Sequence, residues 1–146
     1  MVSRASLPVL VTLAERKTGL VRIRKAARAT GSEVSSAMIK ALWPLPREVR
    51  QTLTLDNGHE HSRWKSIERY GGVKVFFAHP YHSWERGTNE NTNGLIRWYL
   101  PKRTDFARIS ARTIQAIEDA LNNRPRKRLG WRTPLEVFNQ SVALRH

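Results

Sequence analysis

Two carboxylates in the chain have the residue types and spacing for metal chemistry. Asp56 ends the alternating polar and apolar run at residues 51–55, and Glu90 lies in the amide-rich run 89–94, Asn-Glu-Asn-Thr-Asn-Gly. Residues 57–89 separate the two acids, a gap of 33. A carboxylate at a strand tip and a second one on a later helix can share a divalent ion, because Mg(II) prefers oxygen ligands. In a chain of net charge +14, this pattern favours metal-dependent chemistry on a phosphodiester.

Asp56 also has a purely structural interpretation. The sequence Asp-Asn-Gly at residues 56–58 is typical of a hairpin turn. However, residues 60–70 have helical spacing rather than the alternation of a second strand. A strand tip that faces a helix start is where open α/β sheets place their sites, so both interpretations stay open.

Glu90 shares one face of a predicted helix with Arg86, Asn93 and Arg97. The structural alternative is a solvated face on which Glu90 pairs with one of the arginines. Asparagine is a poor helix former, so the three asparagines at positions 89, 91 and 93 favour ligand contact over a plain surface.

The charge distribution indicates a polyanionic partner. The chain has 26 Lys and Arg against 12 Asp and Glu. Residues 1–55 carry 10 basic and 3 acidic side chains, residues 56–96 carry 5 of each, and residues 97–128 carry 9 and 3. A neutral segment around the two acids is therefore flanked by basic surfaces, which favours nucleic acid.

Composition excludes several other classes of protein. With no cysteine, the chain has no disulfide, thiolate metal site or Cys nucleophile. His59-Glu60-His61 lacks a second ligand pair at metal spacing. No apolar run approaches the roughly 18 residues that span a bilayer, so we expect a cytoplasmic protein without a membrane partner.

The elements that position these side chains alternate strands and helices in one predicted α/β domain. Ser32 and Thr133 are the expected helix N-caps, and Leu95, Trp98 and Tyr99 the expected apolar face of the helix that carries Glu90. We expect strands at 9–14, 20–24, 51–55 and 73–77, and helices at 33–42, 60–70, 87–99, 110–122 and from 133.

The loop over residues 124–128, Arg-Pro-Arg-Lys-Arg, is either a solvated loop or a phosphate clamp, and the net charge favours the clamp. Together with the Glu90 face and one further lysine, it gives the expected DNA-contacting residues: Arg86, Asn93, Arg97, Lys102, Arg124, Arg126, Lys127 and Arg128.

Several stretches of the chain resemble the insertion-sequence-30 family of bacterial transposases. The run Pro-Tyr-His-Ser-Trp-Glu-Arg-Gly-Thr-Asn-Glu-Asn-Thr-Asn-Gly-Leu-Ile-Arg at 80–97 is by far the most specific. The resemblance extends over about residues 9–140, and its other stretches are 13–18 (LAERKT), 54–58 (TLDNG), 99–102 (YLPK), 122–127 (NNRPRK) and 133–134 (TP).

The resemblance implies an RNase H-like integrase core with a catalytic triad of two aspartates and a glutamate. Asp56 matches the second aspartate and Glu90 the glutamate, as catalytic residues and metal ligands at the family's spacing of 33. It further implies two Mg(II) or Mn(II) ions, cleavage and joining of transposon ends, and a helix-turn-helix region ahead of the core.

The chain departs from the family at its start. The first aspartate of the triad belongs on a strand upstream of Val9, yet residues 1–8 contain no Asp or Glu. Glu15, the first acid in the chain, matches a different family motif. We therefore expect a truncated core, with residues 1–8 as lead-in, 9–140 as partial catalytic core and 141–146 as tail. Such a core lacks the first, central strand, which leaves strand edges to be paired or covered.

The expected function is metal-dependent cleavage and strand transfer of transposon ends, by a partial catalytic domain that is inactive alone. The alternative is a non-catalytic fragment that binds DNA or regulates intact transposase. The expected partners are double-stranded DNA, as terminal repeats and target, and further copies of the chain or intact transposase. The expected location is the bacterial cytoplasm, at the nucleoid when DNA is bound.

Overall fold

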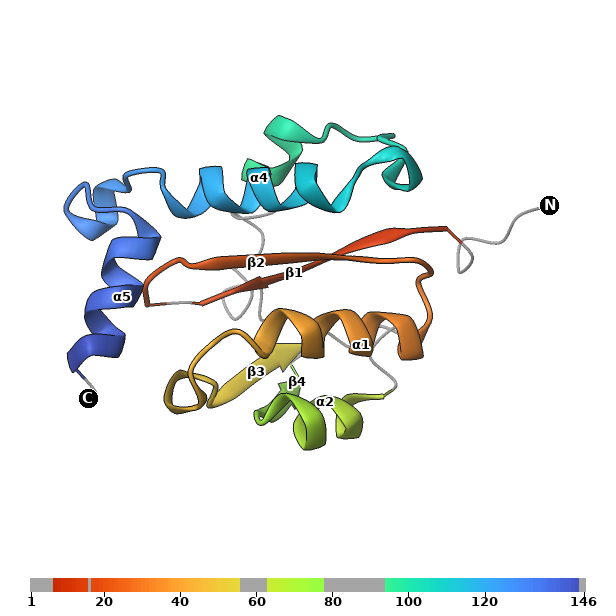
Figure 1. The fold of residues 1–146 in the computed structure, drawn as a ribbon, viewed down its shortest axis with the longest axis horizontal. Helices are drawn as coiled ribbons and strands as arrows, with labels where there is room; N and C mark the ends of the chain where they lie inside the picture. The colour runs from red at the N-terminus through yellow and green to blue at the C-terminus, as the bar shows by residue number, and fades with distance from the viewer. Residues whose placement is uncertain (1–6, 16, 56–62, 78–93, 145–146) are drawn as a thin grey trace.

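Residues 7–15, 17–55, 63–77 and 94–144 are described in this computed structural model (Figure 1). The described strands are β1 (Val9–Ala14), β2 (Val21–Ala26), β3 (Thr52–Leu55) and β4 (Lys74–Phe77). The helices are α1 (Gly31–Leu42), α2 (Trp64–Gly71), α4 (Ala111–Asn122) and α5 (Pro134–Leu144), with helical residues 94–99 and three short 3-10 turns. The alternation expected from the sequence is confirmed for these residues.

Strands β1 and β2 form an antiparallel hairpin in which Val11 pairs with Arg24 and Leu13 with Arg22. The connection is closed by Glu15, whose carboxylate accepts hydrogen bonds from the amide of Lys17 at 3.0 Å and from that of Thr18 at 2.6 Å. Gly19 has a φ of +77°, a conformation that costs glycine little. Residues 17–19 therefore form a tight turn between the two strands.

Helix α1 begins at Gly31, two residues earlier than a cap at Ser32 requires, so the expected cap at Ser32 is wrong. Thr30 has an extended backbone, with φ −97° and ψ 155°, and its side chain accepts from the amide of Glu33 at 3.3 Å. Gly31 and Ser32 are thus inside the first turn. The apolar spacing was correct, because Val34, Met38 and Leu42 are all buried.

Strands β3 and β4 are parallel, with Leu53 opposite Val75 and Leu55 opposite Phe77. Helix α2 connects them and ends at Gly72, whose φ of +67° gives a left-handed C-cap. Ile67 is fully buried, whereas Tyr70 on the same helix is 55% exposed.

The β1–β2 hairpin lies between α4 and α1 (Figure 1). Two hydrophobic clusters pack against it. One cluster joins β1, α1, α2 and β4, and Val9, Leu13 and Leu53 pack against it. The other joins β2 to α4 and to helical residues 94–99. The hairpin is therefore covered by helices on both faces, as expected of an α/β layer structure.

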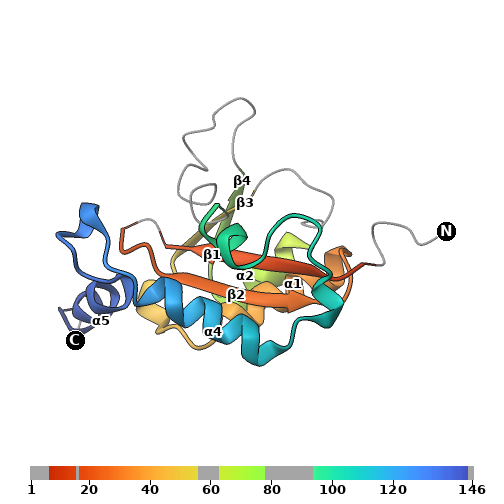
Figure 2. The same cartoon turned by 90° about the horizontal axis from the view of Figure 1, so that it is seen from above.

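The described strands form two separate two-stranded sheets, β1–β2 and β3–β4. In both views the strands follow one another in the order β2, β1, β3, β4 (Figures 1 and 2). The two sheets share the cluster that contains Val11 and Val75, although no ladder joins them among the described residues.

Candidate nucleic-acid and metal site

The two expected metal ligands, Asp56 and Glu90, lie outside the described residues, as do Arg86 and Asn93. What the structure describes is the strand that leads to Asp56. Strand β3 ends at Leu55, which pairs with Phe77 at the end of β4. The carboxyl ends of two parallel strands meet at one edge, where open α/β sheets place functional residues.

No group of three or more His, Asp or Glu side chains that could hold a metal ion occurs within 7–15, 17–55, 63–77 and 94–144. These ranges therefore offer no alternative metal centre to the one expected at Asp56 and Glu90.

Helical residues 94–99 present a basic and aromatic surface. Ile96 and Leu100 are buried in the cluster with α4, and Arg97 is exposed. Trp98 is 82% exposed and Tyr99 41% exposed. Of the expected apolar face, Leu95 packs against this cluster, whereas the expectation is wrong for Trp98 and Tyr99. The helix packs through Ile96 and Leu100, at i and i+4, and this turns Trp98 outward.

Lys102 follows this helix in an exposed turn. Its neighbour Arg103 is also exposed and has a φ of +71°. Arg97, Trp98 and Lys102 thus form a short exposed stretch with two cations and one large aromatic ring.

The basic loop after α4 splits into two pairs of side chains. Arg126 donates from Nη2 to the carbonyl oxygen of Leu121 at 3.2 Å, in the last turn of α4. The pKa of Arg126 is lowered, first by burial and then by the neighbouring Arg124 and Arg128. Arg126 therefore satisfies an orphan carbonyl at the end of a helix and is not a free phosphate ligand.

Arg128 is occupied as well, since its Nη1 donates to the carbonyl oxygen of Lys17 at 3.3 Å. Its guanidinium covers the β1–β2 turn so closely that a Cβ added at Gly19 would lie 2.8 Å from Nη2. Arg124 and Lys127 are exposed and, within the described part of the chain, make no side-chain hydrogen bond or ion pair. These two cations are the ones available to an anionic ligand.

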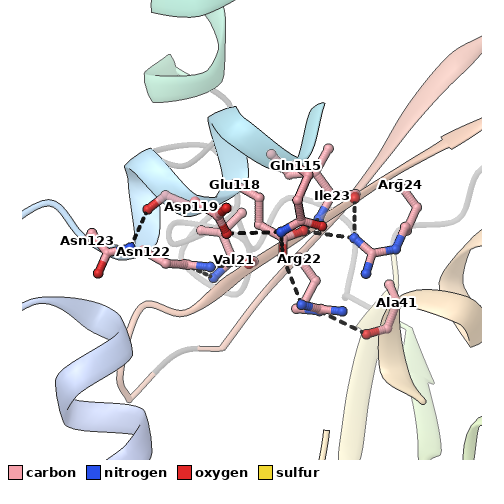
Figure 3. Close-up of polar contacts among 10 residues, drawn as sticks. All are labelled: Val21, Arg22, Ile23, Arg24, Ala41, Gln115, Glu118, Asp119, Asn122 and Asn123. Atoms are coloured by element: carbon pink, nitrogen blue, oxygen red, sulfur yellow. Dashed lines mark hydrogen bonds and ion pairs between the residues drawn. The ribbon is translucent and has the colours of Figure 1, made fainter. Parts of the chain in front are cut away.

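Sequence reasoning missed a buried polar network around Glu118 (Figure 3). The Glu118 side chain is 2% exposed and accepts from Nη1 of Arg22 at 2.8 Å and from Nη1 of Arg24 at 2.9 Å. It also accepts from the backbone amide of Ile23 at 2.8 Å. The sequence did contain an indication of this buried carboxylate, because Glu118 lies one turn after Ile114 on the apolar face of α4.

Asn122, one turn after Glu118, extends this network along the same strand (Figure 3). Its side-chain oxygen accepts from the amide of Val21 at 2.8 Å, and its amide nitrogen donates to the Val21 carbonyl at 2.9 Å. Arg22 has a lowered pKa, first because it is buried, and Glu118 partly offsets this effect. The network is internally satisfied, so it holds α4 to β2 and leaves no group free for catalysis.

No protein-family model matches the chain. It is 46% identical over 136 residues to the transposase for insertion sequence element IS4351 from Bacteroides fragilis, which covers 91% of the chain and 40% of that protein. It is 44% identical over 131 residues to the transposase for IS1086 from Cupriavidus metallidurans, and this match covers 90% of the chain and 39% of that protein. It is 41% identical over 135 residues to transposase InsI for IS30A from Escherichia coli K12, and this match covers 92% of the chain and 35% of that protein.

The chain is a homologue of the insertion-sequence-30 family transposases. It spans about two fifths of the length of these curated relatives, or slightly less.

The fold of this transposase homologue matches an integrase catalytic core. The catalytic core domain of BIV integrase aligns with a TM-score of 0.66 and 18% identity, over 97% of this chain and 98% of that one. The expected RNase H-like α/β class is thereby confirmed. Because the likeness extends over nearly all of both chains, it does not confirm that the homologue lacks a strand.

Among the described residues of the transposase homologue, no helix is long and apolar enough to cross a membrane.

Proposed function

We propose that this chain is part of the catalytic core of an insertion-sequence-30 type transposase and acts in DNA transposition. The observation that carries the proposal is the 46% identity over 91% of the chain to such a transposase. The integrase-core fold supports it independently. The reaction is metal-dependent cleavage of transposon ends and their transfer to target DNA.

The proposed metal ligands are Asp56 and Glu90. Asp56 follows the end of β3 directly, at the carboxyl edge of a parallel pair. Carboxylate oxygens fit Mg(II) or Mn(II), and the bound ions supply activation of the attacking oxygen and stabilisation of the leaving oxygen. The residues of this chain hold the ions and position the DNA end.

The proposed DNA contacts fall into two classes. Arg97, Lys102, Arg124 and Lys127 are exposed and suited to phosphate. Arg126 and Arg128 are held by carbonyl oxygens, so they shape the loop that presents Lys127. Arg86 and Asn93 complete the proposed set on the Glu90 face.

We further propose that the chain is inactive alone. The separation of the described strands into two sheets supports this view. The domain division at residues 9–140 stays a prediction, although α5 continues to Leu144.

The test is strand cleavage and transfer of duplexes that carry the terminal repeats, with Mg(II) or Mn(II). We expect no product from the chain alone and restored product when the part of the transposase ahead of this region is supplied. Asp56→Ala and Glu90→Ala should abolish the restored activity. Robust turnover by the chain alone would contradict the proposed inactivity.

A second candidate function is favoured by the charge of +14 and by the four exposed cations. The chain would then be a non-catalytic DNA-binding fragment that regulates intact transposase. Salt-dependent DNA binding that survives Asp56→Ala, combined with inhibition of intact transposase and no restored cleavage, would favour this alternative.

A further inference from the structure

The β1–β2 turn lies at the end of the molecule that carries α5 and the loop after α4 (Figures 1 and 2). Arg128 of that loop donates to the carbonyl oxygen of Lys17 in the turn at 3.3 Å, across 111 residues of sequence. Arg128 and Pro134 both approach Gly19, since a Cβ added there would lie 2.8 Å from Nη2 of Arg128 and 3.8 Å from Cγ of Pro134. Two segments that are remote in sequence therefore form one continuous surface.

Hydrogen bonds within the β1–β2 turn fix the backbone of Lys17. The Glu15 carboxylate accepts from the amides of Lys17 and Thr18 and from the Thr18 hydroxyl at 2.5 Å. Thr18 is buried, and its hydroxyl oxygen accepts from the amide of Leu20 at 3.2 Å. The Lys17 side chain is exposed and, within the part of the chain that the structure describes, makes no hydrogen bond or ion pair. Its ammonium group is thus open to a ligand.

The loop after α4 presents Lys127 in the same way. The amide of Arg126 donates to the carbonyl of Arg132 at 3.0 Å, and the amide of Trp131 donates to the carbonyl of Arg126 at 2.8 Å. These bonds close the loop on itself, with Lys127 at the start of its 3-10 turn. Lys127 therefore resembles Lys17, because each has a fixed backbone and an exposed ammonium group.

The end of α4 holds the turn and the loop to one frame. Asn122, the last residue of α4, bonds both the amide and the carbonyl of Val21, the first residue of β2 after the turn. Arg124 follows two residues later and is exposed. Lys17, Arg124 and Lys127 therefore extend from segments that are bonded to one another, so their spacing does not depend on flexible connections.

Positive charge accumulates on this surface. The pKa of Arg126 is lowered first by burial and then by the charges of Arg124 and Arg128. Glu15, the acid of the turn, is already occupied by three donors. An anion bound here would therefore relieve repulsion among the cations, and its own phosphates would release condensed counterions.

We propose that Lys17, Arg124 and Lys127 form one phosphate-binding site, which holds the backbone of a DNA duplex without reading its sequence. Lysine ammonium groups bind phosphate as point charges, and contacts to phosphate position a protein on DNA without specifying bases. The choice of DNA as the ligand rests on the proposed function, whereas the convergence of the three cations does not.

The first test measures the affinity of the full chain for labelled duplexes by fluorescence anisotropy, without divalent metal. Lys17→Ala preserves the turn, because the bonds that form it use only the backbone of Lys17. At 0.1 M salt it should weaken binding about five- to tenfold, and it should reduce the slope of log affinity against log salt concentration by about one. The loss should be equal for two duplexes of unrelated sequence, and Lys17→Arg should bind like the original chain.

Arg112→Ala is the control for the loss of one charge. Arg112 is exposed near the other end of α4, about 15 Å from Asn122 along the helix axis. Charges separated by more than about 10 Å are largely screened at 0.1 M salt, so this variant should change the affinity by less than about twofold. Circular dichroism shows whether the variants are folded.

The second test asks whether the lysines contact the same ligand. Lysines of the original chain are acetylated by an activated ester with and without duplex, and mass spectrometry reports each position. Lys17 and Lys127 should lose their reactivity at the same DNA concentration. Lys74, which is exposed at the start of β4, should keep its reactivity. This test needs no substitution, so it decides even where a variant fails to fold.

Equal affinities of Lys17→Ala and Arg112→Ala, or protection of Lys127 without Lys17, would overturn the proposal. A loss confined to one of the two duplex sequences would overturn it as well, and so would equal protection by inorganic phosphate at the same ionic strength. Protection of both lysines without restored strand transfer would support the site and refute the proposed function. Restored strand transfer with Lys17 unprotected would do the reverse.

Discussion

At the residue scale, Glu118 joins two parts of the chain that are far apart in sequence. Its buried carboxylate accepts from Arg22 and Arg24 on β2 and from the amide of Ile23. A buried ion pair contributes little net stability while intact, but the loss of one partner leaves an uncompensated charge inside the protein. The cluster therefore fixes α4 on β2 more through the cost of breaking it than through its own strength.

Glu118→Ala should lower the free energy of unfolding by about 3–5 kcal/mol, because Arg22 and Arg24 lose their buried counter-charge and the Ile23 amide loses its acceptor. Urea denaturation followed by circular dichroism measures the change. Glu136→Ala is the matched control, since Glu136 is an exposed glutamate on α5 and its loss should change stability by less than about 0.5 kcal/mol. Equal effects of the two substitutions would contradict this role.

Trp98 is the other residue that stands out at this scale, because a tryptophan that is 82% exposed between two cations contributes little to folding. Trp98→Ala should leave stability unchanged within about 0.5 kcal/mol. It should weaken binding of DNA with unpaired bases about tenfold, by loss of base stacking. Fluorescence anisotropy with labelled oligonucleotides measures the affinity. Trp131→Ala, which removes another exposed tryptophan, is the comparison and should leave the affinity near that of the original chain.

At the element scale, the loop after α4 shows why a run of cations is not one functional unit. Arg126 and Arg128 bond to main-chain carbonyls, whereas Arg124 and Lys127 extend into solvent. From the sequence, the loop was either solvated or a phosphate clamp, and the net charge favoured the clamp. Arg126 and Arg128 instead have structural roles, because the chain reverses after α4 and brings the carbonyls of Leu121 and Lys17 within their reach.

We therefore expect Arg126→Ala to change the stability of the fold and Lys127→Ala to change DNA binding. Arg126→Ala should lower the free energy of unfolding by about 1–2 kcal/mol through the unsatisfied Leu121 carbonyl. Lys127→Ala should leave stability unchanged, and it should reduce by about one the slope of log affinity for DNA against log salt concentration. Urea denaturation and salt titrations of DNA binding distinguish them. A reversed pattern would show that the assignment of the two side chains is wrong.

The elements themselves were largely predictable, because apolar spacing reports which face of each is buried. The buried residues of the two expected helices at 33–42 and 110–122 follow helical spacing: Val34, Met38 and Leu42 of α1, and Ile114, Ile117 and Leu121 of α4. The predictions of a helix cap and of an apolar helix face failed where two nearby residues were equally suited to the same position. Thr30 and Ser32 are both good caps, and Trp98 and Ile96 both suit an apolar face, so only packing could choose between them.

At the scale of the whole molecule, net charge sets the salt dependence of DNA binding. The affinity of the chain for a duplex should fall at least about tenfold between 50 and 200 mM salt, because Arg97, Lys102, Arg124 and Lys127 displace condensed counterions. Anisotropy titrations at several salt concentrations test this expectation. A flat response would indicate that the exposed cations do not contact phosphates and would remove the main support for both candidate functions.

By itself, the sequence determined the kind of molecule this is. The run at 80–97 resembled the insertion-sequence-30 family of transposases, and the basic flanks indicated a polyanionic partner, because both depend on residue types and their order along the chain. Only the tertiary structure decided how the outer edges of β2 and β4 are closed. That outcome depends on Glu118 and Asn122 meeting β2 from about a hundred residues away, and on Glu68 folding back onto β4. Periodicity along the chain indicates which face of a strand is buried, but not what lies beside its edge, because hydrogen bonds at that edge come from segments remote in sequence.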